Sequence, residues 1–433
     1  MTDTRKVALN ALIEYQRSDT FSNLTLKKHL RDIKDIRDRK FITALFYGVL
    51  ERRLLLDYYI AAVSSVKIKK INIVVLNILR LGLYQIIFMS TPESAACNTS
   101  VQLAKNNGQY KSAGFVNAIL RKLAKTYAQI KLPDDKLKRL SVEYSISESN
   151  LNKLVEAFGI DGFEKIMNEG YASDDGLYAS VNYKKISTHD LIELLKKEGV
   201  NTSETEYPGL IRIENAVDIE NSKAYINGFF HIVGLPSYIT ASVVFSQKNS
   251  VVIDMCAAPG GKTFAISYNS DSDSKIYAFD IHEHKINNVI QNCKRLGVTN
   301  VFPRVSDGTV CFDEYKEIAD TVLCDVPCSG LGMIFKKPDI KYKEIDFDNL
   351  IDTQYKILTN ASRYLKSGGK LVYSTCTINP EENIGIINKF LFDNSEFCLD
   401  TDTEIYQGEY GQYQFYPNEK FSDGFYIAVL SKK

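Results

Sequence analysis

The stretch SVVIDMCAAPGGKT, residues 250–263, decides the fold class of this chain. A short apolar run ends at Asp254, a turn of small residues follows, and the turn opens into a helix. Further short apolar runs come at 275–281, 301–307, 321–328, 370–376 and 423–430, and helical stretches such as 282–297 and 349–369 separate them. Strands that alternate with helices predict a doubly wound α/β sheet whose strands run parallel.

The chain before residue 245 has a different pattern. In KFITALFYGVLERRL, apolar residues 42, 45, 46, 49 and 50 fall on one face of a helix. Apolar residues over 115–123 fall on one helical face in the same way. We therefore predict an all-α bundle over residues 1–132. A helical connector is expected over 133–175, and a small α+β module over 176–244. The α/β domain then covers 245–433, so the fold class is multidomain.

Composition indicates a soluble globular protein, with 433 residues, 45% hydrophobic and 24% charged. The longest apolar stretch, 71–89, is interrupted by polar residues, which predicts a buried core helix and no membrane span. No signal peptide is expected in the polar start MTDTRKVALN. The eight cysteines are scattered without a CxxC pair, so we expect no metal site, no disulfide framework and a reduced, cytoplasmic protein.

The net charge of zero hides an asymmetry. Residues 1–140 carry 25 basic and 11 acidic side chains, a charge of +14, and the remainder carries −14 because both totals are 53. A basic module joined to an acidic one suggests a polyanionic partner for the first. The alternative, a basic solvated surface without a partner, is equally compatible with charge alone.

The turn DMCAAPGGKT (254–263) fits neither common phosphate motif. A P-loop needs a glycine five residues before Gly261, where Cys256 stands, and GxGxxG is absent. The next strands end in Asp280, Asp307 and Asp325. Each could cap a helix, but acidic tips on successive strands favour a ligand with hydroxyl and amine donors and little phosphate. That chemistry favours S-adenosylmethionine over NAD at the carboxyl ends of the strands.

Cysteines end two of the strands, in TVLCDVPCSG (321–330) and LVYSTCTINPEEN (371–383). Buried packing is the usual role of a free cysteine. A thiolate near a methyl donor, however, can add to carbon 6 of cytosine and make carbon 5 nucleophilic. Enzymes that methylate an exocyclic amine need no cysteine and typically end this strand in Asn/Asp-Pro-Pro-Tyr/Phe. Here the tip is Asp325-Val326-Pro327-Cys328, and the residues alone leave both thiols as candidates for the nucleophile.

Several motifs resemble the Nop/Sun family of RNA cytosine-C5 methyltransferases. CAAPGGKT, DVPCSGLG and YSTCTINPEEN are similar to its three main motifs, and FKKPDIKY (335–342) to its basic-Pro-Asp segment. The stretches DRKFITALFYGVLERRLLLDYYI, ILRLGLYQIIFMSTPESAACNTSVQLAK and GFVNAILRKLA resemble the NusB-like RNA-binding domain of the bacterial Sun, or RsmB, type. That type methylates 16S ribosomal RNA, which implies 16S rRNA (cytosine 967) as partner, S-adenosylmethionine as cofactor and a monomeric enzyme.

The resemblance also implies site residues. Cys376 matches the nucleophile, Cys328 the cysteine that assists release of the methylated RNA, and Asp325 a contact to the cytosine ring and the cofactor. The implied cofactor-binding residues are Cys256, Ala257, Ala258, Pro259, Gly260, Gly261, Lys262, Asp280, Asp307 and Asp325.

The chain departs from the family pattern in three places, one of which is FYPNEKFSDGFY (415–426), which lacks the histidine that often stands before Asp-Gly-Phe-Phe in the family. Ser180 stands where the family usually has an arginine before Val181-Asn182, and Gly234-Leu235 replaces a usual Gln-Asp. A rival hypothesis is a non-catalytic RNA-binding factor that keeps a relic of the enzyme domain. The intact cysteines and glycine turn favour the enzyme.

Overall fold

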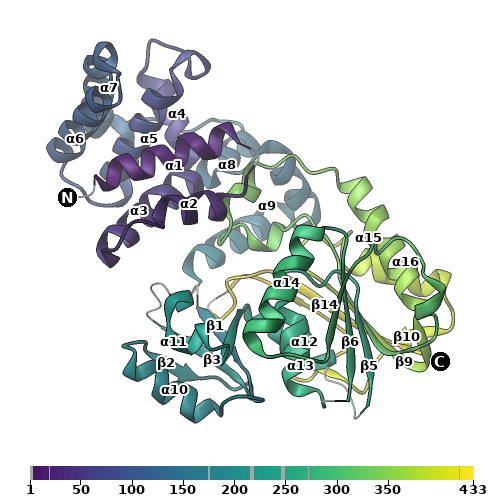
Figure 1. Ribbon diagram of the computed structural model, residues 1–433. Coiled ribbons are helices and arrows are strands. Elements are labelled where there is room, and N and C mark those ends of the chain that lie inside the picture. Colours follow the sequence, from purple (N-terminus) through teal and green to yellow (C-terminus); the bar gives the residue numbers. More distant parts are fainter. Residues whose placement is uncertain are drawn as a thin grey trace. The chain divides into compact units, whose positions relative to one another are not determined.

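The computed structural model describes residues 3–18, 20–173, 176–214, 219–244, 249–271, 273–418 and 420–433 (Figure 1). The chain forms two compact units, one of residues 1–163 with 337–344 and the other of residues 164–336 with 345–433. The four-part division drawn from sequence stays a prediction. Its boundaries at 175 and 245 lie outside the described residues.

The first unit is helical where it is described, as expected. Its elements are α1 (Thr4–Arg17), α2 (Ser22–Leu30), α3 (Ile36–Glu51), α4 (Arg53–Val63), η1 (Ile68–Lys70), α5 (Ile73–Phe88), α6 (Glu93–Asn106), η2 (Tyr110–Ser112), α7 (Ala113–Thr126), η3 (Tyr127–Gln129), α8 (Lys136–Tyr144) and the first part of α9 (Glu148–Ala172). Asp35 caps α3 by accepting from the backbone N–H groups of Arg37 and Asp38. The apolar face predicted for α3 is buried in the core of this unit.

The long apolar stretch forms α5, whose middle is buried on all sides among α1, α3, α6 and α7. This confirms the prediction of a core helix. Arg80 within it is paired with Asp57 at 2.6 Å, which satisfies the buried charge. Among the described residues, no helix is long and apolar enough to cross a membrane.

Residues 337–344 lie between two strands of the large sheet in sequence, yet they fold with the helical unit. They include η7 (Pro338–Tyr342). The Tyr342 hydroxyl donates to the Leu50 carbonyl at 2.5 Å, and the Asn150 amide donates to the Ile340 carbonyl at 3.1 Å. Lys341 is fully buried and donates to the Tyr144 carbonyl at 3.3 Å. The segment is therefore a built-in part of the bundle, which the sequence pattern did not predict.

The second unit begins with the last part of α9, and the predicted small module follows it. β1 (Leu177–Val181), β2 (Thr202–Glu204), β3 (Leu210–Ile213) and β4 (Phe230–Val233) form an antiparallel sheet in the order β2-β3-β1-β4. The module also contains α10 (Thr188–Lys197), η4 (Ile219–Asn221) and α11 (Lys223–Ile226). Ser187 caps α10 as its sequence suggests. These strands and helices agree with the α+β composition expected for this part of the chain.

The large sheet has the order β10-β14-β9-β8-β5-β6-β7, with β13 paired to β14. Its parallel strands are β5 (Val251–Asp254), β6 (Lys275–Asp280), β7 (Val301–Val305), β8 (Ala319–Asp325) and β9 (Leu365–Thr375). The expectation of a purely parallel sheet needs correction at one edge. There β14 (Phe425–Lys432) runs antiparallel to β9 and pairs with β10 (Phe397–Leu399) and β13 (Gln412–Phe415). β11 (Glu404–Tyr406) and β12 (Glu409–Tyr410) form a separate two-stranded sheet that packs against β13.

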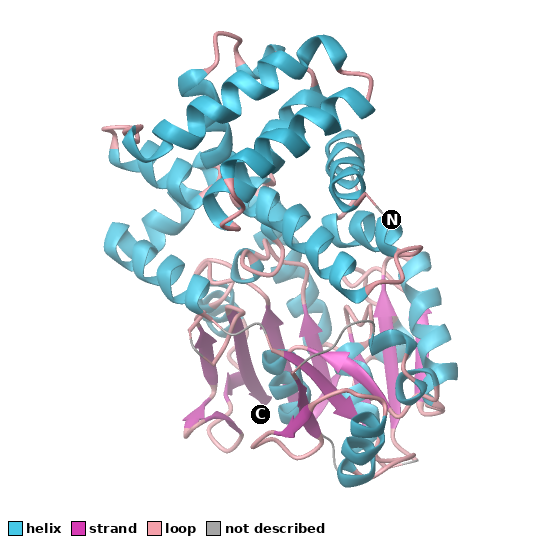
Figure 2. Ribbon diagram, turned by 90° about the vertical axis from the view of Figure 1, so that its left-hand side faces the viewer, coloured by secondary structure: helices cyan, strands magenta, loops and turns pink. Residues whose placement is uncertain are grey.

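Helices cover both faces of this sheet (Figures 1 and 2). Along β8, Val322 and Cys324 face a core shared with α15 (Phe347–Ser362) and α16 (Ile384–Asp393). Leu323 faces the opposite core, shared with α12 (Leu235–Val244), α13 (Gly261–Asn269) and α14 (Glu283–Leu296). Burial on both faces explains why the strands are nearly continuous apolar runs. Two short helices, η5 (Asp313–Tyr315) and η6 (Leu331–Met333), complete the unit.

Candidate active site

The strand order reverses next to β5, because the chain continues from β5 to β6 and β7 on one side and returns to β8 on the other. Ligands of doubly wound sheets bind outside the carboxyl ends of the strands at such a switch point. The turn 254–260 leaves β5 at this point, and the segment Asp325–Cys328 leaves β8 beside it. The topology therefore brings two of the predicted motifs together.

The turn after β5 has a backbone that only a small residue fits. Gly260 has a φ of 106°, and a Cβ there would lie 2.4 Å from the Phe264 ring. The turn closes through a hydrogen bond from the Gly260 N–H to the Ala257 carbonyl at 2.7 Å. No side chain caps the first amides of α13, so these backbone N–H groups form a place where a ligand carboxylate can be held.

Asp254, the last residue of β5, holds this turn through hydrogen bonds. Its carboxylate is buried, accepts from the Thr263 hydroxyl at 2.7 Å, and lies 3.4 Å from the Cys256 N–H. Burial raises the pKa of Asp254 to about 7, although the Thr263 hydrogen bond opposes the rise. Burial also raises the pKa of the Cys256 thiol well above its usual range. Cys256 therefore stays a neutral thiol.

Asp325 ends β8 and is held on both oxygens. The Lys262 ammonium lies 2.7 Å from Oδ2, and the Ser374 hydroxyl donates to Oδ1 at 2.8 Å. Lys262 also lies 5.1 Å from the centre of the Phe425 ring. The contact joins Lys262 of the cofactor turn to Asp325, which the resemblance assigns to both the cytosine and the cofactor. Ser374 is a member of this group that sequence reasoning missed.

Asp280 and Asp307 lie at the ends of neighbouring strands, as predicted. Asp280 accepts from the His282 N–H at 2.9 Å, and Asp307 accepts from the N–H of Thr309 at 2.9 Å. Each thus stabilises its own turn, while the Asp280 side chain lies 3.7 Å from Lys285. Their role as ligand contacts stays a prediction, because local capping accounts for the hydrogen bonds seen.

The two cysteines at the strand tips face each other. Cys328 Sγ lies 2.9 Å from Cys376 Sγ, and the Cys376 backbone N–H donates to Cys328 Sγ at 3.2 Å. Both residues are half-buried. The hydrogen bond to Cys376 and burial raise the pKa of the Cys328 thiol well above its usual range. A protonated Cys328 can therefore donate its S–H toward Cys376.

Close backbone packing fixes the Cys376 tip from behind. The Gly332 N–H donates to the Cys376 carbonyl at 3.1 Å, and the Gly424 N–H donates to the Gly332 carbonyl at 2.8 Å. A Cβ at Gly332 would lie 1.9 Å from the Gly424 carbonyl oxygen. Only glycine permits this approach. The antiparallel edge strand β14, which begins just after Gly424, is thus tied to the tip that carries Cys376.

The other cysteines are packed or peripheral. Cys97 and Cys324 are buried, Cys398 is exposed, and burial raises the pKa of Cys293 to about 11. No cluster of potential metal ligands occurs among the described residues.

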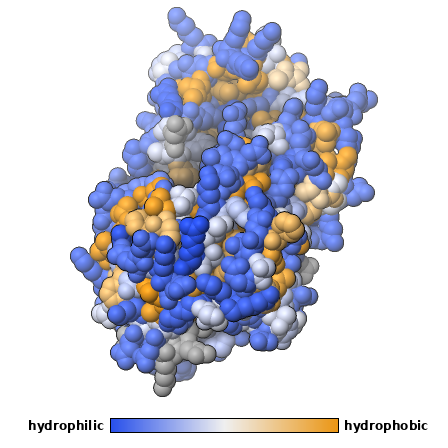
Figure 3. All heavy atoms as spheres, turned by 90° about the vertical axis from the view of Figure 1, so that its right-hand side faces the viewer, coloured by the Kyte–Doolittle hydropathy of each residue, from blue (hydrophilic) through white to orange (hydrophobic). Residues whose placement is uncertain are grey.

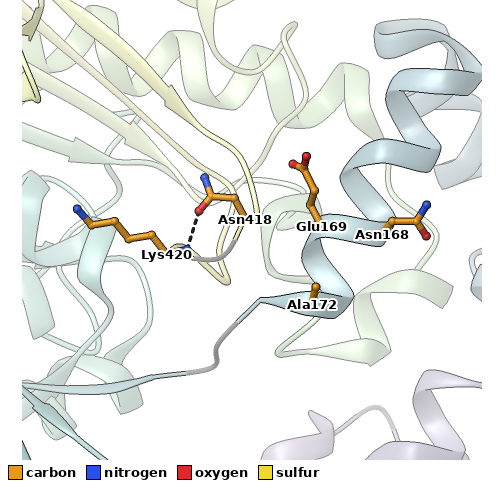
Figure 4. Close-up of a pocket in the computed structure, with 5 residues that line it drawn as sticks. All are labelled: Asn168, Glu169, Ala172, Asn418 and Lys420. Carbon is orange, nitrogen blue, oxygen red and sulfur yellow. Dashed lines mark hydrogen bonds between the residues drawn. The ribbon is translucent and has the colours of Figure 1, made fainter.

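A hollow of about 610 Å³ lies elsewhere on the second unit, lined by Asn168, Glu169, Ala172, Asn418 and Lys420 (Figure 4). The Lys420 N–H donates to Asn418 Oδ1 at 2.9 Å beside it. It contains none of the predicted site residues. The face drawn in Figure 3 is largely hydrophilic with small separate apolar patches, which is ordinary for a protein surface.

Comparisons with known proteins agree with this architecture. Residues 241–431 match the family model described as 16S rRNA methyltransferase RsmB/F, and residues 2–125 match the NusB family. The "Probable ribosomal RNA small subunit methyltransferase B" of Bacillus subtilis is 30% identical over 100% of this chain and 99% of its own length. The protein of the same description from Synechocystis is 29% identical over 100% of both chains.

Solved structures show the same fold. "PH0851" superposes over 100% of this chain and 99% of its own with a TM-score of 0.84 at 23% identity. "NSun6 from Pyrococcus horikoshii with SFG" covers 65% of this chain and 97% of its own with a TM-score of 0.58 at 25% identity. SFG is an analogue of S-adenosylmethionine. The chain therefore belongs to the RsmB/F family of 16S rRNA methyltransferases, with a NusB-like helical part and S-adenosylmethionine as the methyl donor.

Proposed function

We propose that this protein methylates carbon 5 of a cytosine in 16S rRNA, cytosine 967 in the family's bacterial type, through a covalent bond to Cys376. The observation that carries the proposal is the pair of facing thiols, 2.9 Å apart at the ends of adjacent strands β8 and β9. Methylation of an exocyclic amine would leave both cysteines without a role. The turn after β5 lies beside them and suits a methyl donor.

The cofactor would be held by the turn 256–262 and the acidic strand ends. The open amides at the start of α13 suit its carboxylate, and Asp280 suits the ribose hydroxyls. Asp307 would contact the rest of the nucleoside. S-adenosylmethionine supplies the methyl group that carbon 5 receives.

The chain's own groups would then act in order. The Cys376 thiolate forms a bond to carbon 6, and the electron pair of the 5,6 double bond moves to carbon 5. Asp325, whose carboxylate is fixed by Lys262 and Ser374, would contact the cytosine ring by accepting from its amine. After methylation the carbon 5 proton passes to solvent water, its bonding electrons re-form the 5,6 double bond, and the electron pair of the bond to carbon 6 returns to the Cys376 sulfur as that bond breaks. Cys328, directly beside Cys376, would assist this elimination.

The cytosine must be unpaired or flipped out, because a side chain cannot reach carbon 6 within a stacked helix. We infer that the basic helical unit binds the surrounding RNA. On α7, Arg121, Lys122 and Lys125 are exposed while the opposite face is buried. Replacing these three by glutamine should lower the affinity for 16S rRNA and flatten its salt dependence, measured by filter binding. We propose that the enzyme acts as a cytoplasmic monomer.

Two variants test the chemistry. Cys376→Ala should abolish 5-methylcytidine formation from labelled S-adenosylmethionine and 16S rRNA. Cys328→Ala should instead accumulate a protein–RNA adduct that survives denaturing electrophoresis. Cys398→Ala, at an exposed cysteine, serves as the matched control. Normal turnover by Cys328→Ala, activity of Cys376→Ala, or a product other than 5-methylcytidine would overturn the proposal.

A further inference from the structure

A buried glutamate joins the two loops that carry the cysteines. Glu382 is fully buried in the segment that follows Cys376, and its carboxylate accepts four hydrogen bonds. Oε2 accepts from the Ser329 N–H at 2.8 Å and the Gln354 amide at 2.9 Å. Oε1 accepts from the Thr377 hydroxyl at 3.3 Å and the Asn379 amide at 3.1 Å.

These donors come from both sides of the thiol pair. Ser329 directly follows Cys328, and Thr377 directly follows Cys376. The two loops also meet through a hydrogen bond of 2.7 Å between the hydroxyls of Ser329 and Thr377. The same Gln354 amide donates to the Pro327 carbonyl at 2.9 Å, so the Cys328 loop is fixed before and after the cysteine.

The glutamate is itself held in place. The Tyr373 hydroxyl, in β9, donates to the Glu382 carbonyl at 2.7 Å. A buried carboxylate is stable only when its acceptor sites are filled by donors. Within the described part of the chain, four donors and no paired cation meet this carboxylate, which makes it a rigid acceptor between two loops whose cysteines are 48 residues apart in sequence.

We propose that Glu382 is a positioning residue that sets the spacing of the Cys328 and Cys376 thiols. It acts through the loop backbones, since its carboxylate is enclosed by protein donors. Its importance for catalysis rests on the proposed function, whereas its effect on thiol spacing does not. Its charge also adds to the hydrogen bond and the burial that raise the pKa of Cys328.

The variant Glu382→Gln tests this inference. A glutamine side chain offers one oxygen and one NH₂ group. In either orientation the NH₂ group faces hydrogen-bond donors, those at Oε1 or those at Oε2, and those donors lose their acceptor. The neighbouring Glu381→Gln is the matched control, because Glu381 is exposed. Thiol spacing is measured without RNA by diamide, a diazene that takes two hydrogens from two thiols, becomes a hydrazine and leaves one S–S bond. Peptide mass mapping identifies the Cys328–Cys376 bond.

We expect Glu382→Gln to form this disulfide at least tenfold more slowly than the wild type, and Glu381→Gln to match the wild type. In the methylation assay Glu382→Gln should lower kcat at least tenfold and change KM for 16S rRNA less than twofold. Glu382→Asp, which keeps the charge but is one methylene shorter, should fall between. Disulfide formation at the wild-type rate in folded Glu382→Gln would overturn the inference.

Misfolding of Glu382→Gln and failure of the proposed function can each be told apart from failure of this inference. If Glu382→Gln does not fold, Gln354→Met decides, because it removes the amide that joins Glu382 to Pro327 while nearly keeping its volume. It should slow the disulfide several-fold, and a wild-type rate would count against the inference. If the wild type makes no 5-methylcytidine, the proposed function fails, whereas the disulfide rates still test Glu382.

Discussion

Asp254 gives the sharpest physical test of the cofactor turn. Its carboxyl is 1% exposed, and burial raises its pKa from 3.8 to about 7. The folded protein therefore binds a proton more readily than the unfolded chain between pH 3.8 and 7. Stability falls as pH rises through that window, because the unfolded state releases the proton first. Above pH 7 both states are ionised and the loss is complete.

The size of the effect follows from the shift. About three pH units at about 1.36 kcal/mol each give a total loss of about 4 kcal/mol, of which about 2 kcal/mol falls between pH 5 and 7. Asp254→Asn cannot ionise. Its amide NH₂ group replaces one of the oxygens that accept from the Thr263 hydroxyl and the Cys256 N–H, so one of these donors loses its acceptor. This lowers the stability by about 1–3 kcal/mol at every pH. Relative to the wild type, the variant should therefore gain about 2 kcal/mol between pH 5 and 7.

The assay should report on the turn itself, because unfolding of a chain with two units is not a two-state process. Hydrogen exchange of the amides of α13, followed by mass spectrometry, gives the local opening free energy. Comparing wild type and variant at the same pH cancels the intrinsic exchange rate. Thr359→Val, on α15, serves as a control. A free-energy difference between Asp254→Asn and wild type that stays constant from pH 5 to 8 would refute the reasoning.

Three further predictions follow from single residues. Gly260→Ala should weaken S-adenosylmethionine binding at least tenfold by calorimetry, because a Cβ at φ 106° meets Phe264; unchanged affinity would contradict the fit of the turn. Burial lowers the pKa of Lys341 to about 7. The unfolded chain keeps this proton to higher pH, so the helical unit should become more stable as pH rises from 7 to 10. Hydrogen exchange of the α8 amides should show this rise in the wild type and not in Lys341→Met. Burial lowers the pKa of His231, whose Nε2 lies 2.8 Å from the Gly261 carbonyl, from 6.5 to about 3. The folded state around it should therefore lose stability as pH falls below 6.5, because the unfolded chain takes up the proton first. Exchange of β4 should then accelerate in acid in the wild type more than in His231→Asn.

Local patterns were enough to predict the helical bundle and, in the large sheet, the strands β5 to β9 and β14; the short strands β10 and β13 were not predicted. Each of these strands is an apolar run that ends near a polar residue, and helices such as α3 and α7 have a one-sided apolar face, so the signals lie within a few residues. The direction of β14 is different. Its run, DGFYIAVL, is compatible with either direction, and only its pairing with β9 makes it antiparallel.

The position of residues 337–344 and the hydrogen bonds of Glu382 could not be predicted, because both depend on partners that are distant in sequence. FKKPDIKY has charges that suggest exposure, yet Lys341 is buried because the bundle supplies an acceptor at Tyr144. Glu382 belongs to a polar run after Cys376 that suggests a solvated loop. Its donors Ser329 and Gln354 are 53 and 28 residues away. Only the fold brings such partners together.

The order in which the two thiols act was open from the residues alone, and resemblance favoured Cys376 as the nucleophile. The surroundings of Cys328 agree with this order. Its hydrogen bond to Cys376, its burial and the charge of Glu382 all raise its pKa, so Cys328 keeps its proton at neutral pH. A thiol that stays protonated is a poor nucleophile but a suitable hydrogen-bond donor to a neighbouring thiolate. An S–H group of Cys328 aimed at Cys376 Sγ would stabilise negative charge on Cys376 before attack. The same contact places Cys328 beside the carbon–sulfur bond that must later break.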